Sequence, residues 1–350
     1  MEPTPDDTPQ LTLRERFLKS WFPPLAVVGG TATLIVAALR VRPEPKPAPP
    51  APAPGGKMLP MATPSRTFDR QYTVTGVIGR VPATKPFRVS LAGVAVGADD
   101  RLYALGDNEV REFGPDGRLL RQFAVGEKAQ CLTIGPDRRV YVAGAGRVDI
   151  YDESGRRAGG FAVGDAATPA SLTAIKIAGA DVLVADASAR IIRRLDGAGR
   201  PLGLIGDQHK TKSFILPNGH LDMAVDAAGI VHATDTGRHQ VTAWALDGTP
   251  KGRFGKFGMS DPADFVGCCN PVNVAIAPDG KIVTGEKMIA RVKVFDPAGR
   301  LVSLIGPEHF DPKCTHIYLA VDSKGRIFAA DPVRREIQVF SPGTTNGGRG

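Results

Sequence analysis

Residues 273–306 read NVAIAPDGKIVTGEKMIARVKVFDPAGRLVSLIG, a series of short apolar segments separated by Pro, Asp and Gly. Each segment alternates apolar and polar residues, as a half-buried strand does, and the Asp and Gly positions favour tight turns. Residues 223–255, MAVDAAGIVHATDTGRHQVTAWALDGTPKGRFG, follow the same order. The chain therefore contains a repeated antiparallel β unit, and the fold class is all-β.

The repeat occurs six times. Further copies begin at Gly93, Leu132, Ala174 and Tyr318. The last apolar residue of each first strand serves as a marker, and the six markers are Val96, Ile134, Ile177, Val225, Ile276 and Val321. Successive markers are 38, 43, 48, 51 and 45 residues apart, which is the length of one blade of a β-propeller. We therefore expect a six-bladed propeller.

The last copy lacks an outer strand, because its third strand, at 334–340, is followed only by a short polar tail. The missing strand is expected at the start of the domain. Residues 76–79 read GVIG and match GLIG at 203–206 and SLIG at 303–306, which end outer strands. Pairing of 71–79 with 334–340 would close the ring and protect its sheet edges.

Segments such as PVNVAIAPDGKIVTGEKMIARVKVFDPAGRLVSLIG resemble NHL repeats, which have a P-x-G-V-A-V-D start and a later R-I-x-V-F strand. The resemblance covers residues 70–341 and implies a six-bladed propeller. It implies no single activity, because such propellers include binding scaffolds, lyases and hydrolase-like proteins.

Composition narrows the classes of partner. The 350 residues carry a formal charge of +8, but Lys and Arg are spread over strands and turns and form no basic run. A dispersed charge of this kind indicates a generally basic surface and argues against nucleic acid as a partner.

The N-terminal region predicts a membrane anchor. An uncharged apolar run lies between Lys19 and Arg40, near the minimum length for a spanning helix. A cleaved signal peptide is the main alternative, but Arg40-Val41-Arg42 follows the run directly and offers no suitable cleavage site. We expect a single-pass membrane protein whose propeller is extracytoplasmic, either periplasmic or at the cell surface. The sequence divides into five segments: a cytoplasmic tail at 1–20, a transmembrane helix at 21–41, a Pro-rich linker at 42–65, the propeller at 66–342 and a disordered tail at 343–350.

Most unusual residues fall in loops that emerge on one face of the predicted propeller. These loops join second to third strands and outer strands to the next blade, and long loops on a rigid scaffold often bind ligands. The candidate binding residues on this face are Cys268, Cys269, Asn270, Glu286, Lys287, His309 and Cys314.

The repeat register groups four of the unusual residues. His220 and His316 each lie five residues before a marker, and Cys269 and Cys314 each lie seven before one. We therefore expect all four near the mouth of the central channel. The two histidines are candidate ligands for a divalent metal, although isolated rim histidines more often only hydrogen-bond to loops.

The cysteines allow three interpretations. In an exported domain, the ordinary interpretation is a structural disulfide from Cys268 or Cys269 to Cys314. Cys131 is then a buried residue that packs as a small apolar side chain. A reactive thiol and a Cys/His metal site are the others. Adjacent cysteines seldom bridge each other easily, because the ring strains the peptide between them.

Several acidic residues have simple structural interpretations. Glu286 and Lys287 form either a solvated ion pair or an acid/base pair. Asp186, Asp235 and Asp331 recur at matching second-strand ends, where a carboxylate caps a turn.

Three functions remain open. The first is a non-catalytic envelope module that binds a protein or small-molecule ligand through the loop-rich face. The second is a metal-dependent propeller enzyme, similar to lyases or lactonases, with a central metal held by His220 and His316, with or without a carboxylate. The third is a thiol redox partner that uses Cys268, Cys269 and Cys314.

Overall fold

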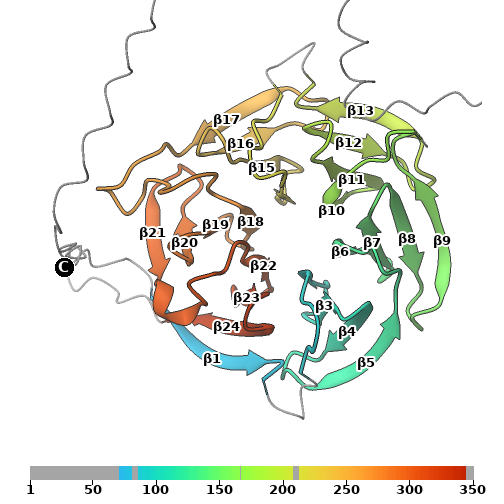
Figure 1. Cartoon of the computed structure of the whole chain (residues 1–350), viewed down its shortest axis with the longest axis horizontal. Helices are drawn as coiled ribbons and strands as arrows, with labels where there is room; N and C mark the ends of the chain where they lie inside the picture. The colour runs from blue at the N-terminus through green and yellow to red at the C-terminus, as the bar shows by residue number, and fades with distance from the viewer. Residues whose placement is uncertain (1–70, 81–85, 166, 208–212, 344–350) are drawn as a thin grey trace, which may run out of the picture. The chain divides into compact units, whose positions relative to one another are not determined.

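A computed structural model describes residues 71–80, 86–165, 167–207 and 213–343. These residues form a β-propeller of six four-stranded blades arranged in a ring (Figure 1). The sequence-based prediction of an all-β, six-bladed propeller is therefore confirmed. The predicted tail at 1–20, membrane helix at 21–41 and linker at 42–65 lie outside the described residues. No helix in the described part of the chain has the length and apolar character needed to cross a bilayer.

Each blade is an antiparallel sheet whose strands run in chain order from the central channel outward. Blade 1 contains β2 (Gly93–Val96), β3 (Leu102–Gly106), β4 (Glu109–Phe113) and β5 (Leu119–Ala124). Blade 2 contains β6 (Cys131–Ile134), β7 (Val140–Gly144), β8 (Arg147–Tyr151) and β9 (Arg157–Ala162). Blade 3 contains β10 (Leu172–Ala178), β11 (Asp181–Asp186), β12 (Ile191–Leu195) and β13 (Pro201–Ile205).

The other three blades follow the same plan. Blade 4 contains β14 (Met223–Val225), β15 (Val231–Asp235), β16 (Gln240–Trp244) and β17 (Pro250–Phe254). Blade 5 contains β18 (Asn273–Ile276), β19 (Ile282–Glu286), β20 (Arg291–Phe295) and β21 (Leu301–Ile305). A short 3-10 helix, η2 (Pro307–His309), precedes blade 6, which contains β22 (Tyr318–Val321), β23 (Ile327–Asp331) and β24 (Glu336–Pro342).

Blade 6 takes its outer strand from the start of the domain. β1 (Tyr72–Ile78) pairs antiparallel with β24, with Ile78 opposite Ile337 and Tyr72 opposite Pro342. Figure 1 shows β1 lying along the outer side of β24 and completing the ring. The predicted closure is confirmed, and it leaves no blade with an unpaired third strand.

Apolar side chains fill the spaces between neighbouring blades. Phe254 of blade 4 packs against Phe295 of blade 5, with ring centroids 4.9 Å apart. Turns between third and fourth strands approach the previous blade closely: Gly299 abuts Phe254, and Gly199 abuts Phe161. Both glycines have φ near +80°, and neither leaves room for a Cβ atom. This packing fixes the inner strands that surround the channel.

Candidate functional site

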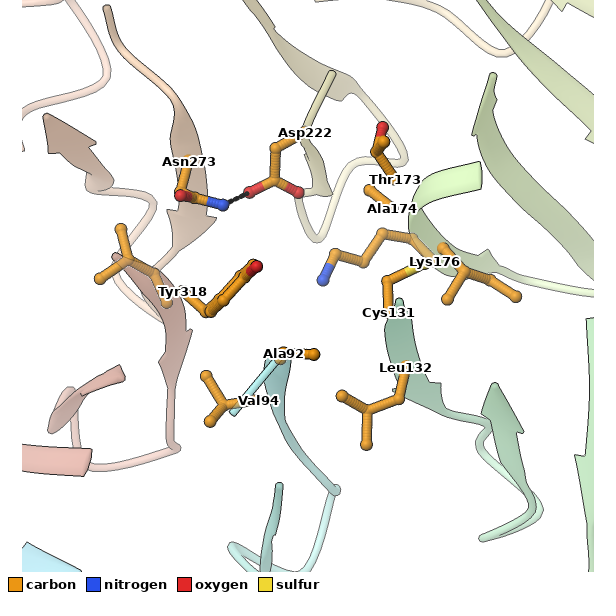
Figure 2. Close-up of a pocket in the computed structure, with 13 residues that line it drawn as sticks. Ala92, Val94, Cys131, Leu132, Thr173, Ala174, Lys176, Asp222, Asn273 and Tyr318 are labelled. Atoms are coloured by element: carbon orange, nitrogen blue, oxygen red, sulfur yellow. Dashed lines mark hydrogen bonds between the residues drawn. The ribbon is translucent and has the colours of Figure 1, made fainter. Parts of the chain in front are cut away.

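The central channel contains three cavities that follow one another along the inner strands. Residues just before the inner strands line a cavity of about 330 Å³, the loop mouth, which includes Gln130, Thr173, Asn218, His220, His316 and Tyr318. Residues at the far ends of these strands line one of about 310 Å³, the turn mouth, which includes Val96, Asp100, Val225, Asp226, Ile276 and Asp322. A cavity of only about 30 Å³, the waist, lies between them (Figure 2).

The waist is lined by one residue from the same register position in every blade, three residues before each marker. Blades 1 to 3 supply small side chains there and blades 4 to 6 supply polar ones, giving the ring Gly93, Cys131, Ala174, Asp222, Asn273 and Tyr318. At this register position the ring is therefore polar on the side of blades 4 to 6. Blade 3 adds polar groups from neighbouring positions, Thr173 and Lys176.

Asp222 is the best-supported polar group of the waist. Its carboxylate accepts hydrogen bonds from the Asn273 amide and the Val274 backbone, both at 3.0 Å, and from its neighbour Met223 at 2.8 Å. Burial raises the pKa of Asp222, while the charge of Lys176 opposes the rise. Figure 2 shows the Lys176 ammonium pointing into the channel from the neighbouring blade 3, with the Tyr318 hydroxyl facing the same space.

Two amide atoms in the channel lack hydrogen-bond partners among the described residues. Asn273 Oδ1 is a buried acceptor in the waist, and Asn218 Nδ2 is a buried donor at the loop mouth. Buried polar atoms are almost always hydrogen-bonded, so each of these two atoms remains available to a water molecule or a polar ligand.

The loop mouth contains two histidine rings in contact. The centroids of His220 and His316 are 4.5 Å apart with an edge-to-face angle of 67°, and His316 lies nearly parallel to Tyr318 at 6.0 Å. The Asn273 amide nitrogen is 3.4 Å from His220 Nε2. The repeat register thus placed these two histidines beside each other.

Both imidazoles are neutral at physiological pH. Burial lowers the pKa of His220 to about 4, and the charge of Lys287 adds to this effect. Burial likewise lowers the pKa of His316 to about 4, with further contributions from His220 and Lys287. Lys287 follows β19 in a loop on this face, so its charge acts on both rings. Neutral rings offer one donor and one acceptor each.

The predicted divalent metal does not fit this pair. No group of three His, Cys, Asp or Glu side chains with the geometry of a metal site exists in the described ranges. Asn273, an amide and not a charged ligand, is the polar side chain within hydrogen-bonding distance of His220 Nε2. Two imidazoles alone provide too few donors for a stable site of the usual kind. We therefore derive no chemistry through a metal.

The predicted disulfide to Cys314 is wrong, because all four cysteines are free. Cys314 is buried in the core between blades 5 and 6, and its thiol donates to the carbonyl of His316 at 2.8 Å. Cys268 and Cys269 instead lie against each other, with their Sγ atoms 2.6 Å apart. The equal register of Cys269 and Cys314 placed both in equivalent loops, but the thiol of Cys314 turned into the core.

Glu286 does not pair with Lys287, so both predicted roles of this pair are wrong. Its carboxylate is fully buried and binds Arg291 and Lys293, the latter at 3.1 Å. It also accepts a hydrogen bond from the backbone of Val266 at 3.2 Å. Glu286 is the last residue of β19, and it therefore holds a loop to its blade.

Three aspartates occupy the same strand-end position in other blades. Asp186 binds Arg193 at 2.7 Å, Asp235 binds Arg238, and Asp331 accepts the backbone N–H groups of Val333 and Arg334. The predicted turn-capping role is confirmed for Asp331 and for Asp186, which accepts the backbone N–H of Ala189 at 3.2 Å, whereas the Asp235 carboxylate accepts the backbone N–H of Ile215 from another loop.

Two other candidates lie outside the channel lining. Asn270 joins two loops, since its amide donates to the carbonyls of Val266 and Lys287 and accepts from the Lys287 backbone at 2.9 Å. His309 lies in η2 with its ring 5.2 Å from that of Phe340. Both residues support loops, and neither borders the three cavities described above.

Sequence analysis missed Lys176, Asp222, Asn273 and Tyr318. The register contained the needed signal, because one position three residues before the marker is small in blades 1 to 3 and polar in blades 4 to 6. Lys176 alone breaks the apolar pattern of an inner strand directly before the marker Ile177.

A scan against protein-family models gives no match, and a search of curated proteins finds no relative. Solved structures resemble the fold. A streptogramin B lyase matches with a TM-score of 0.55 and 10% identity, over 80% of this chain and 100% of its own. A gluconolactonase from Xanthomonas campestris matches with a TM-score of 0.55 and 16% identity, over 73% and 87%.

A chain of a mitotic checkpoint complex matches with a TM-score of 0.53 and 16% identity, over 85% of this chain and 99% of its own. Two of these structures are named for enzymes and one for a regulatory assembly. At such low identities the likeness establishes the six-bladed fold alone.

Proposed function

We propose that this propeller binds a small, polar, hydroxylated molecule in the loop mouth and waist of its channel. The supporting observation is the pair of unpartnered amide atoms, Asn218 Nδ2 and Asn273 Oδ1, whose residues line the loop mouth of about 330 Å³ and the waist of about 30 Å³. Small-molecule sites are clefts of roughly 300 to 1,000 Å³ with a few convergent polar groups. Each neutral imidazole leaves one ring nitrogen for a ligand, since the Asn273 amide lies 3.4 Å from His220 Nε2 and the Thr315 hydroxyl 3.1 Å from His316 Nδ1. Lys176 adds a positive charge for an anionic substituent.

The binding site lies on the loop-rich face that the sequence predicted, but inside the channel and not at its rim. The proposal also retains the anchor, with residues 21–41 holding the propeller outside the cytoplasm as an NHL-like envelope module. The anchor rests on the uncharged apolar run and the Pro-rich segment after it. Membrane fractionation tests it directly: a full-length product in the soluble fraction would remove the anchor from the proposal.

Ligand binding is tested by a thermal-shift screen of sugar acids, sugar lactones and polyols. At least one compound should raise the melting temperature of the parent, because a ligand that binds only the folded state stabilises it. The substitutions His220→Ala and Asn273→Ala should abolish the shift. His309→Ala is the matched control, since His309 lies on the same face away from the channel, and it should retain the shift. Equal loss in all three variants would contradict a channel site.

A lyase or lactonase-like activity is the second candidate. An imidazole with a pKa of about 4 is unprotonated at pH 7 and free to accept a proton, although as a weak base, and two structures with the same fold are a lyase and a gluconolactonase. Here the reaction would use His220 or His316 directly, without a metal. Hydrolysis of gluconolactone by the parent, insensitive to chelator, lost in His220→Ala and His316→Ala and retained in His309→Ala, would favour the enzyme. Binding without turnover would favour the module.

A further inference from the structure

The loop between blades 4 and 5 presents two adjacent thiols with different exposure. Cys268 is exposed and Cys269 is buried, at 3% exposure, yet their Sγ atoms are 2.6 Å apart. This separation is closer than two unbonded sulfur atoms ordinarily approach. An accessible thiol next to a protected one provides an attacking and a resolving sulfur in the same loop.

The loop holds the two sulfurs in this arrangement through contacts at both ends. The Asn270 amide donates to the carbonyls of Val266 and Lys287, at 2.6 and 3.1 Å, and Val266 donates to buried Glu286. Cys269 itself has φ +66°, a left-handed conformation that few non-glycine residues adopt. The surrounding bonds therefore impose the backbone that brings the thiols together.

The other two cysteines lack this combination. Cys131 is buried, with its thiol 3.6 Å from the Ala143 carbonyl, and burial raises its pKa to about 12. Cys314 is 1% exposed and donates to the His316 carbonyl, and burial together with Asp331 raises its pKa to about 12. Burial raises the pKa of Cys269 too, so what distinguishes Cys268 and Cys269 from these two residues is the exposure of Cys268 and the contact between the two sulfur atoms.

We propose that Cys268 and Cys269 form a redox-active dithiol that exchanges with disulfide substrates and closes to a disulfide between adjacent residues. The Cys268 thiolate attacks one sulfur of R–S–S–R, forming a mixed disulfide and releasing one RS⁻. The Cys269 thiolate then attacks the Cys268 sulfur, forming the Cys268–Cys269 bond and releasing the second RS⁻. Two electrons pass from the cysteines to the substrate, and the two cysteine protons go to solvent or to the released thiolates.

The small ring strains the intervening peptide, so the bond is expected to be easily reduced. This distinguishes a reactive pair from a structural bridge. The activity is separate from ligand binding in the channel, because neither sulfur lines the loop mouth or the waist.

The test uses the full chain, reduced and then equilibrated with oxidised glutathione, quenched with acid, unfolded and labelled with N-ethylmaleimide. Peptide mass mapping should find Cys131 and Cys314 labelled, and Cys268 and Cys269 unlabelled in a peptide lighter by two hydrogen atoms. Reduced glutathione at millimolar concentration should restore labelling of both. This measurement needs no variant, so misfolding of a mutant does not obscure it.

Two variants sharpen the assignment. Cys268→Ser replaces an exposed thiol and should leave Cys269 without an intramolecular bond, whereas Cys314→Ala should leave the Cys268–Cys269 bond intact. Linkage of either residue to Cys314, a stable glutathione adduct on Cys268, or full labelling of all four cysteines after equilibration would overturn the proposal.

Discussion

The two mouths of the channel are nearly equal in volume but differ in how their polar groups are satisfied. At the turn mouth, Asp322 binds Arg326 at 2.5 Å, Asp226 binds His232 at 2.9 Å, and Asp100 accepts from Ser323 at 2.6 Å. At the loop mouth and the waist behind it, amide atoms of Asn218 and Asn273 have no partner among the described residues. One guanidinium nitrogen of Arg326 is also unpartnered, but Arg326 does not line the turn mouth. Among the side chains that line the two mouths and the waist, those with an unpartnered atom lie at the loop mouth and the waist.

The difference arises from the connections that form each mouth. Turn-mouth connections are short turns in which one Asp accepts the backbone N–H groups two and four residues later, as Asp226 does with Ala228 and Ile230. Asp322 repeats this pattern with Lys324 and Arg326. Each such carboxylate is hydrogen-bonded within its own turn. Loop-mouth connections are longer, and they leave side chains directed at the channel.

Loss of β1 is expected to destroy both mouths together, and this is the largest effect. Deleting Tyr72–Ile78 exposes the edge of β24 and removes Ile78 from a core cluster between blades 6 and 1. Circular dichroism and light scattering should show loss of the cooperative thermal transition together with aggregation. A truncated chain that unfolds cooperatively at the parent's melting temperature would show that the ring does not need this strand.

The loop mouth should make stability depend on pH through His220. Its folded-state pKa is about 4, below the ordinary value of 6.5, so the unfolded chain binds the proton more tightly between these values. The neutral His220 therefore contributes fully to the free energy of unfolding above pH 6.5. As the pH falls toward 4, this contribution is lost and the free energy of unfolding decreases by roughly 3 kcal/mol. His220→Gln, which does not titrate, should show a flatter profile in urea unfolding over this range. Parallel profiles for the two proteins would mean that the His220 imidazole takes up its proton in the folded protein as readily as in the unfolded chain.

Loss of a carboxylate at the turn mouth should lower the stability of the protein and leave ligand binding unchanged. Asp322→Ala leaves the Arg326 guanidinium and two backbone N–H groups without their acceptor, at a cost of about 1 to 3 kcal/mol. A compound identified in the thermal-shift screen should still stabilise this variant as much as it stabilises the parent. A lost shift in Asp322→Ala, with a retained shift in Asn273→Ala, would transfer the ligand site to the turn mouth.

The sequence predicted the ring well because blade repeats impose a fixed register. The markers Val96, Ile134, Val225, Ile276 and Val321 each end an inner strand, and Ile177 lies one residue before the end of β10. The same register predicted that His220 and His316 lie at the channel mouth, and the structure adds that their rings are in contact. These features depend on backbone position, which the period of the repeat determines.

Side-chain partners were less predictable, because they depend on contacts that register does not specify. Cys269 and Cys314 share a register position, but one thiol meets its chain neighbour and the other donates into the core. Glu286 was assigned to Lys287 beside it, yet Arg291 and Lys293 on the adjacent strand compensate its buried charge. Adjacent residues on a strand point to opposite faces, so the cross-strand partner is the closer one.

The smallest expected effect concerns Lys287, the one rim candidate whose charge acts on the loop mouth. Its ammonium disfavours a second positive charge and so contributes to the low pKa of both His220 and His316. In Lys287→Met both pKa values should rise, by roughly 0.5, since burial still opposes protonation. Two-dimensional NMR of the imidazole rings across the acid range measures this directly. Lys313→Met is the matched control, because Lys313 is exposed on a loop of the same face and is not among the charges acting on either ring. If Lys313→Met moves the two pKa values as far as Lys287→Met does, the effect belongs to the general basic charge of this face, and Lys287 has no particular place at the loop mouth.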